Sequence, residues 1–341
     1  MKAFIFSAVL AFALAASVRA EFYLYQEIGT TPSYTFYGAA GINNNGEVVG
    51  TAFDTANRPV AVRYAGGVLN IAPSPGPSHS TWGNGINATG TIVGLCDRTG
   101  HPSGNVLHVF YANPGSPAVD FDSNFTRNSE AKAINDSGYV VGTVGSQAFL
   151  GHTSGWIFPL ASTLGNNFVA RGLNNSIVVV GNSAPFGGLT YNAWTGDITF
   201  LGFALGWNNE ASAINASGVV AGKVGTQGFL YNAGVVTLFG SNITTVSGIN
   251  GNGDVVGTTS LGHGFVYLKT SGHFLDLNTV VASSISSIWT LVAATGINDH
   301  GAICGSARRL ATAADGPGVG TYVYRAFKIT PFIFFPLPLI Q

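Results

Sequence analysis

Charged side chains are scarce in this sequence. Only 9% of the 341 residues are Asp, Glu, Lys or Arg, and the formal net charge is −1, whereas a globular protein usually carries about 25% charged residues. A nucleic-acid-binding protein needs a basic patch to meet the phosphates, and no stretch of this chain supplies one. The composition therefore excludes nucleic acid as an expected partner.

Cysteine is also rare, because the chain has only Cys96 and Cys304. A chain of this length buries a large core without disulfides, so we expect two buried thiols and leave a disulfide between them open. The seven histidines show no His-x-x-x-His spacing, and too few carboxylates flank the Asn-rich turns to hold calcium. We predict no metal and no cofactor.

The first 20 residues read as a secretory signal. Lys2 precedes an apolar stretch, and Val18-Arg19-Ala20 fits a cleavage site, so we expect a secreted, extracellular protein that begins at Glu21. The apolar stretch is shorter than the roughly 20 residues that span a bilayer, so we expect no stable membrane insertion. Residues 332–341 form an apolar tail whose role we leave open.

A ten-residue motif, A/G-I-N-x-x-G-x-V-V-G, recurs along the rest of the chain. Its apolar anchors are Ile42, Ile86, Ile134, Leu173, Ile214, Ile249 and Ile297, spaced 35 to 48 residues apart. Each motif reads as a strand, an Asn-x-x-Gly turn and a second strand; a third strand with an aromatic residue and a fourth strand follow. Repeats of this length with only strands are typical of propeller blades.

Two details complete the predicted fold. The fourth motif has Ile177 where the others have Gly, so we expect a distorted turn there. The seventh unit has only three strands, whereas the N-terminal segment Phe22–Gly29 has a strand to spare. We predict an all-β, seven-bladed β-propeller of four-stranded blades over residues 21–331, closed by pairing Tyr23–Ile28 with Arg325–Ile329, which removes two exposed edges.

These units resemble the extracellular HAF repeat family, whose repeats carry the same Ile-Asn-x-x-Gly-x-Val-Val-Gly core followed by an Ala-Phe strand. The similarity covers Phe22 to Pro331 and is strongest in the last unit, from Leu275 to Pro331. Ile177, and Cys304 in a Val position, depart from the pattern. The resemblance implies a secreted propeller and no established reaction.

Function is expected on the face where the units differ. In such blades the strand 1–2 and strand 3–4 turns form one face, here named the turn face. The strand 2–3 loops and the crossovers between blades form the opposite, loop face, and variable loops on a rigid scaffold usually carry binding residues. The loops of blades seven, one and two gather the charged candidates Asp54, Arg58, Asp97, Arg98, His101, Arg308 and Arg309; the alternative is that longer loops are simply solvated.

Aromatic residues provide a second set of candidates. Trp82, Trp207 and Trp289 are predicted in the crossovers, where they could stack on sugars or, alternatively, fill gaps between blades. Among the six Asn-x-Ser/Thr sequons, Asn124 and Asn242 are the better glycosylation candidates, because the other four are the motif asparagines themselves.

We therefore expect a binding or surface-interaction module for extracellular glycans or proteins, acting as a monomer through its loop face. The alternative is a polysaccharide hydrolase or lyase that uses loop-face carboxylates such as Asp54, Asp97, Asp122 and Asp315.

Overall fold

The computed structural model describes residues 22–72, 80–98, 106–121, 127–165, 167–312, 315 and 321–332. The predicted signal peptide and nearly all of the apolar tail lie outside these residues. Within the described part, no helix is long and apolar enough to cross a bilayer.

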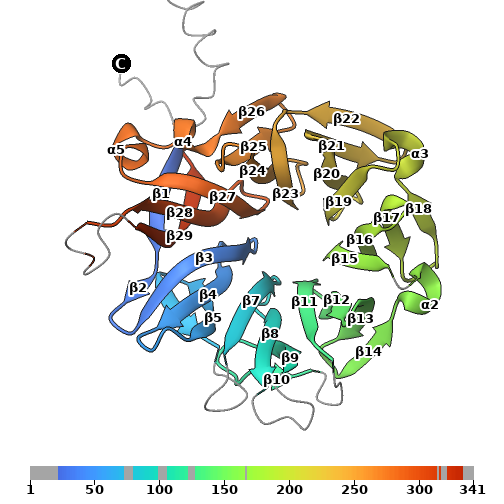
Figure 1. The fold of residues 1–341 in the computed structure, drawn as a ribbon, viewed down its shortest axis with the longest axis horizontal. Helices are drawn as coiled ribbons and strands as arrows, with labels where there is room; N and C mark the ends of the chain where they lie inside the picture. The colour runs from blue at the N-terminus through green and yellow to red at the C-terminus, as the bar shows by residue number, and fades with distance from the viewer. Residues whose placement is uncertain are drawn as a thin grey trace, which may run out of the picture.

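Seven antiparallel sheets are arranged as a ring around a central axis, with one strand of each sheet next to the axis (Figure 1). From blade 1 to blade 7, the innermost strands are β3 (Tyr34–Ile42), β7 (Thr81–Ile86), β11 (Ser129–Ile134), β15 (Phe168–Leu173), β19 (Asn209–Ile214), β23 (Ile243–Ile249) and β27 (Thr290–Ile297). The second strands are β4 (Val48–Asp54), β8 (Ile92–Arg98), β12 (Tyr139–Val144), β16 (Val178–Ser183), β20 (Val220–Val224), β24 (Val255–Thr259) and β28 (Ile303–Leu310).

The outer half of each blade is built in the same order. The third strands are β5 (Pro59–Ala65), β9 (Val106–Ala112), β13 (Gln147–His152), β17 (Gly187–Asn192), β21 (Gln227–Asn232), β25 (Gly264–Leu268) and β29 (Tyr322–Pro331). The outermost strands are β6 (Val68–Ile71), β10 (Val119–Asp120), β14 (Trp156–Pro159), β18 (Ile198–Phe200), β22 (Val235–Phe239), β26 (His273–Asp276) and, in blade 7, β1 (Tyr23–Ile28). Short elements occupy the links between blades: β2 (Thr30–Thr31), α2 (Ala161–Leu164), α3 (Gly202–Leu205), α4 (Leu277–Val280) and α5 (Ser283–Ser286).

The N-terminal strand closes the ring as predicted. The blue strand β1 lies against β29 in the otherwise orange and red seventh blade (Figure 1), and the register runs from Tyr23 opposite Pro331 to Ile28 opposite Ala326. Ile28 is fully buried, so the closing strand is held by core packing as well as by its ladder. The predicted seven-bladed propeller of four-stranded blades, with this closure, is confirmed, and in the first blade the two-residue strand β2 also pairs with β3 as a short fifth strand.

The motif asparagines form a ring of their own, here named the asparagine ring. Each side-chain oxygen accepts backbone N–H groups of its own turn; that of Asn135, for example, accepts from Ser137 and Tyr139. Each side-chain NH₂ donates to the backbone carbonyl of the next motif asparagine, at 2.9 to 3.2 Å, around the complete circle Asn43, Asn87, Asn135, Asn174, Asn215, Asn250, Asn298 and back to Asn43. The motif asparagine thus shapes the turn within a blade and joins that blade to its neighbour. The sequons built on these buried amides have no free side-chain nitrogen to offer.

The last glycine of the motif is required by a β-bulge in the innermost strand. Strand 1 of every blade carries such a register shift opposite strand 2. A Cβ on the motif glycine would meet the backbone carbonyl of the bulge, as Gly50 meets that of Gly38, and in six blades it would also meet a phenylalanine ring. One phenylalanine per blade is at most 1% exposed: Phe36, Phe110, Phe149, Phe168, Phe229, Phe265 and Phe327.

Apolar clusters also fill the seams between blades. Each of seven clusters combines side chains of two neighbouring blades; Phe239 and Phe265, from blades 5 and 6, share one of them. The repeated valines and isoleucines therefore build a continuous ring-shaped core rather than seven separate ones.

The turn in the fourth blade is regular, contrary to the prediction of a distorted one. Ile177 donates to the carbonyl of Asn174 at 3.2 Å, as the motif glycines do in the other turns. To do so it adopts a φ of 56°, in the left-handed region that a β-branched residue rarely enters. The turn keeps its shape because the asparagine ring and the flanking strands fix it, and the strain is confined to one residue.

Both cysteines are buried as thiols, so the alternative of a disulfide between them is not realised. Burial raises the pKa of the Cys304 thiol from 9.0 to about 12. Since only the thiolate is a strong nucleophile, we expect no labelling of the native protein by a thiol-reactive aromatic disulfide at about pH 8. In concentrated guanidinium chloride both thiols should react. Rapid labelling of the native protein would contradict this burial.

Candidate functional site

The two charged residues of blade 1 that were predicted as part of a ligand site are engaged within their own loop. In the strand 2–3 loop of blade 1, Asp54 accepts hydrogen bonds from the backbone of Ala56 and Arg58, and its ion pair to the Arg58 guanidinium is 2.8 Å long. The backbone hydrogen bond from Arg58 is the main cause that lowers the pKa of the Asp54 carboxyl. This aspartate acts as a turn-forming residue.

The charges of blade 7 are engaged in the same way. Arg309 makes a bidentate pair with Asp315, both contacts at 2.7 Å, and its guanidinium lies 5.1 Å from the centre of the Trp289 ring. Arg308 lies over the ring of Tyr322 at 4.4 Å. The hydrogen bond from Arg309 holds the pKa of Asp315 well below its usual range.

Blade 2 completes the predicted charged set. Asp97 accepts the backbone N–H of Ser80 at 2.7 Å and so fastens the incoming crossover. The side chain of Arg98 and all of His101 lie outside the described residues, as does Asp122. Their role in ligand binding stays a prediction.

Asp54 and Asp315 do not have the properties of the general acid that the predicted hydrolase or lyase chemistry requires. A glycosidase needs a carboxylic acid whose pKa is raised as well as a second carboxylate, whereas the pKa values of Asp54 and Asp315 are lowered. Within the described residues, no three His, Cys, Asp or Glu side chains are grouped as a metal site.

The three predicted tryptophans occupy different environments. Trp289 is only 7% exposed, so it packs between Arg309 and the core and offers no face to a ligand. Trp82 is half-buried inside strand β7 rather than in a crossover. Trp207 is 47% exposed in the crossover between β18 and β19, and it alone of the three belongs to an exposed group of rings.

That group, here named the aromatic cluster, consists of Phe186, Phe200, Phe203 and Trp207. Phe186 comes from the β16–β17 loop, and Phe203 and Trp207 come from the crossover that contains α3, so the chain order places them on the loop face of blade 4. Neighbouring ring centres lie 5.1 to 6.5 Å apart. Phe203 is 82% exposed and Phe186 46%, which makes this a continuous apolar surface.

The sequence does contain the aromatic residues of this cluster, but they are divided between two segments of the chain, so inspecting the crossovers alone does not bring them together. Phe186 and Phe203 belong to different loops of one blade, and only the strand order shows that those loops are neighbours. Gly202 lets the group form, because a Cβ there would meet the Trp207 ring.

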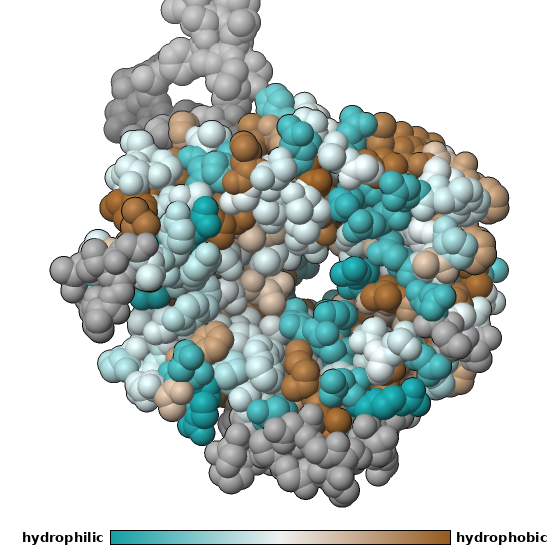
Figure 2. All heavy atoms as spheres, in the orientation of Figure 1, coloured by the Kyte–Doolittle hydropathy of each residue, from teal (hydrophilic) through white to brown (hydrophobic). Residues whose placement is uncertain are grey.

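An axial channel of about 200 Å³ runs between the innermost strands, and Figure 2 shows it as an opening at the centre of the ring. Three consecutive residues of most innermost strands line it, ending at the motif anchor. The residues two places before the anchors supply its polar groups: Asn84, Lys132, Arg171, Ser212, Ser247 and Thr295. The prediction from loops overlooked this position, although aligning the repeats on their anchors shows it to be variable.

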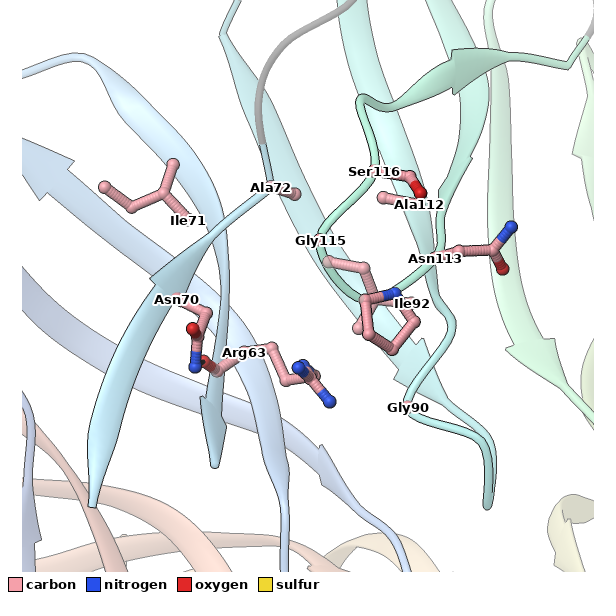
Figure 3. Close-up of a pocket in the computed structure, with 11 residues that line it drawn as sticks. Arg63, Asn70, Ile71, Ala72, Gly90, Ile92, Ala112, Asn113, Gly115 and Ser116 are labelled. Carbon is pink, nitrogen blue, oxygen red and sulfur yellow. Dashed lines mark hydrogen bonds between the residues drawn. The ribbon is translucent and has the colours of Figure 1, made fainter. Parts of the chain in front are cut away.

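A smaller pocket lies between the outer parts of blades 1 and 2 (Figure 3). Arg63 projects toward it from β5, facing Ile92 and the turn that contains Gly115 (Figure 3). Its volume is about 30 Å³, enough for a single water, and Arg63 is paired with Glu47 at 3.0 Å. We regard this pocket as a structural gap between blades.

The predicted glycosylation sites fall in different places. Asn242 is exposed in the crossover between blades 5 and 6, so its side chain is accessible, and its modification stays a prediction. Asn124 lies outside the described residues.

Comparison with known proteins shows the fold and no family. No family model matches the chain, and no curated protein is recognisably related in sequence. Among solved structures, YCF48 bound to a D1 peptide is similar with a TM-score of 0.50, at 12% identity over 89% of this chain and 96% of YCF48. An arginine-to-alanine triple variant of AofleA from Arthrobotrys oligospora aligns with a TM-score of 0.36, at 8% identity over 89% of this chain and 86% of that one. The chain is a seven-bladed β-propeller, the architecture that the first of these similarities also indicates.

Proposed function

We propose that this protein is a binding module that recognises a protein partner through the aromatic cluster on its loop face. The observation that carries the proposal is the exposure of this cluster, in which Phe203 is 82% and Trp207 47% exposed. A contiguous apolar patch on a protein surface usually marks an interaction site. Aromatic residues are also enriched at the centres of protein interfaces.

A protein side chain suits the cluster better than a sugar ring. Neighbouring rings meet at 60° to 86°, so they form a ridged surface rather than one flat stacking platform. Two amides of the adjoining strands are engaged with backbone groups: Asn182 bonds to Ala211, and Asn209 bonds to Gly188 and Gly206. Asn208, next to Trp207, is exposed, but the four rings themselves offer no hydrogen bond to the hydroxyl groups of a sugar apart from the indole N–H, whereas an apolar side chain needs none.

The structure of YCF48 bound to a D1 peptide is compatible with a protein partner, because it shows a chain of similar fold in complex with a peptide. The similarity between the two proteins concerns the fold alone. The partner proposed here is therefore defined by the chemistry of the aromatic cluster and not by the peptide that YCF48 binds. We further propose that the protein acts outside the cell, on the strength of its N-terminal sequence and the resemblance to HAF repeats.

The test is a selection of binding peptides from a displayed random library, with a glycan array screened in parallel. We expect the selection to enrich peptides rich in apolar and aromatic residues. The variant Phe203→Ser should weaken their binding at least about tenfold, about 1.4 kcal/mol, because it removes the most exposed ring of the cluster without opening a buried cavity.

The matched control is Trp194→Ser. Trp194 is also 82% exposed, but it lies in the β17–β18 turn on the opposite face of the same blade, so its replacement should leave binding unchanged. Equal affinity of the Phe203→Ser variant and the native protein for the selected peptides would rule out the aromatic cluster as the site. Glycan binding that depends on Phe203, with no peptide enrichment, would replace the protein partner with a glycan.

A further inference from the structure

The axial channel has an uneven distribution of charge around its wall. At the level two residues before the anchors, blades 3 and 4 contribute Lys132 and Arg171, blades 5 and 6 contribute Ser212 and Ser247, and blade 2 contributes Asn84. The anchors themselves form an apolar ring at the next level toward the turn face, about 6–7 Å along each strand. Polar ligand contacts in the channel are therefore concentrated at one level.

Arg171 is the unbalanced charge of this wall. Its side chain is exposed to the channel, and among the described residues it makes no hydrogen bond or ion pair. Lys132, on the neighbouring strand, is paired with Glu130 at 2.6 Å, and Glu130 also accepts from Asn84 at 3.0 Å. Glu210, the acidic residue of the next innermost strand, β19, is paired with Lys223 at 2.7 Å. One positive charge is left over, and the low-dielectric walls of a narrow channel focus its field.

The next two positions around the ring add hydrogen-bond donors. Ser212 and Ser247 follow Arg171 in blades 5 and 6, and neither hydroxyl has a hydrogen-bond partner among the described residues. Thr295, on the far side, differs because its hydroxyl donates to the carbonyl of Ala39 at 2.9 Å. The free donors thus lie on one arc of the wall, with a guanidinium at its end.

We propose that the axial channel binds a small oxyanion, either a free ion or the anionic group of a small ligand, with Arg171 as its main contact. The guanidinium matches carboxylate, phosphate or sulfate oxygens with parallel N–H donors, and Ser212 and Ser247 can donate to oxygens that point away from the arginine. This site is separate from the aromatic cluster and does not depend on the proposed protein partner.

The experiment is isothermal titration of the full chain with inorganic phosphate, sulfate and acetate at low ionic strength. We expect saturable binding of at least one of them, at one site per chain, that weakens as salt is added. Preference for phosphate or sulfate indicates a tetrahedral ligand group and preference for acetate a carboxylate; both outcomes support the site. No saturable binding of any of the three would overturn the proposal.

Two variants locate the binding. Arg171→Gln should lower the affinity at least about tenfold, about 1.4 kcal/mol, since it removes the uncompensated charge from an exposed position without disturbing the core. Lys269→Gln removes the same charge from an exposed position in the β25–β26 turn, outside the channel wall, and should leave the affinity unchanged. If both variants weaken binding equally, the anion responds to net charge and the channel is not its site. As the folding control, the midpoint of thermal unfolding of each variant should lie near that of the native protein.

Discussion

Replacing Asn135 with Asp is expected to destabilise the folded protein by about 4 kcal/mol near neutral pH, because the carboxylate oxygen that takes the place of the NH₂ would be buried without a hydrogen-bond donor. Asn135 is 3% exposed, and its NH₂ donates to the carbonyl of Asn174 at 3.1 Å across the seam between blades 3 and 4. The substitution keeps the shape and both acceptor contacts within the turn. It therefore removes the link between blades and sets a negative oxygen against the carbonyl it formerly bonded.

The pH dependence of the variant's stability is a sharper test than the magnitude of the stability loss at neutral pH. Burial and the facing carbonyl raise the pKa of the introduced carboxyl in the folded state above its unfolded value. The relative stability of the variant is therefore highest below the unfolded pKa, about 4, where the protonated carboxyl can donate to the carbonyl of Asn174, and it is lost as pH rises through the folded pKa. The deficit should shrink to about 1 kcal/mol in acid, roughly one imperfect hydrogen bond.

The measurement is denaturant unfolding of the native protein and the variant across this pH range. Asn232→Asp is the matched control, because Asn232 is exposed at the end of β21 and makes no side-chain hydrogen bond among the described residues. It should change the free energy of unfolding by less than about 0.5 kcal/mol. A pH-independent deficit in the Asn135 variant would argue against the asparagine ring.

Replacing Gly50 with Ala is expected to cost about 3 kcal/mol, at the upper end for overpacking. The new Cβ would meet the carbonyl of Gly38, the ring of Phe36 and the Cα of Ala39. Two of these three neighbours are backbone atoms of the bulge, and the third is a fully buried ring. None of them can move without disturbing the blade.

Gly41 is the control for this substitution, since it belongs to the same motif copy. The nearest atom to a Cβ there is a Val49 methyl at 3.5 Å, an ordinary contact, and its φ is not positive. Ala133 and Ala213 already occupy the equivalent position in two other blades. Unfolding midpoints should separate the two variants by several degrees; equal midpoints would mean that the bulge does not impose the glycine.

Much of the fold was predictable because every blade repeats the same local instructions. Counting motifs and strands gives seven blades and the closure by Tyr23–Ile28, since an incomplete blade and a spare strand occur at opposite ends of the chain. The asparagine ring was not predictable in the same way, because each turn shows only that its asparagine bonds locally. The neighbouring carbonyl comes within reach only once the blades are arranged in a circle.

The exceptions were harder to predict than the rule. At Ile177 the turn is regular and the residue adopts a left-handed conformation. The sequence alone does not show whether the turn will be distorted or the residue will take this unfavourable conformation. Blades 1 and 4 take their buried ring from the innermost strand, as Phe36 and Phe168, because their third strands offer the smaller Val62 and Leu189 at this level of the core. A periodic pattern predicts the position of the core and not which strand fills it.

The candidate site was predicted least well, because charge in a loop does not reveal whether a partner is already present. Asp54 and Arg309 find their partners within a few residues. Trp207 was predicted correctly as a crossover residue, but its neighbours Phe186 and Phe203 were not predicted, since contacts between loops depend on the path of the chain.

The most direct test of the central claim is hydrogen–deuterium exchange with and without a selected peptide. The claim is that the repeated motif is scaffold and that recognition lies in the aromatic cluster. Exchange should slow on peptide binding in the β16–β17 loop and in residues 202–209, and stay unchanged in the Asn-x-x-Gly turns. Protection confined to those turns, with none around Phe186 and Phe203, would contradict the account.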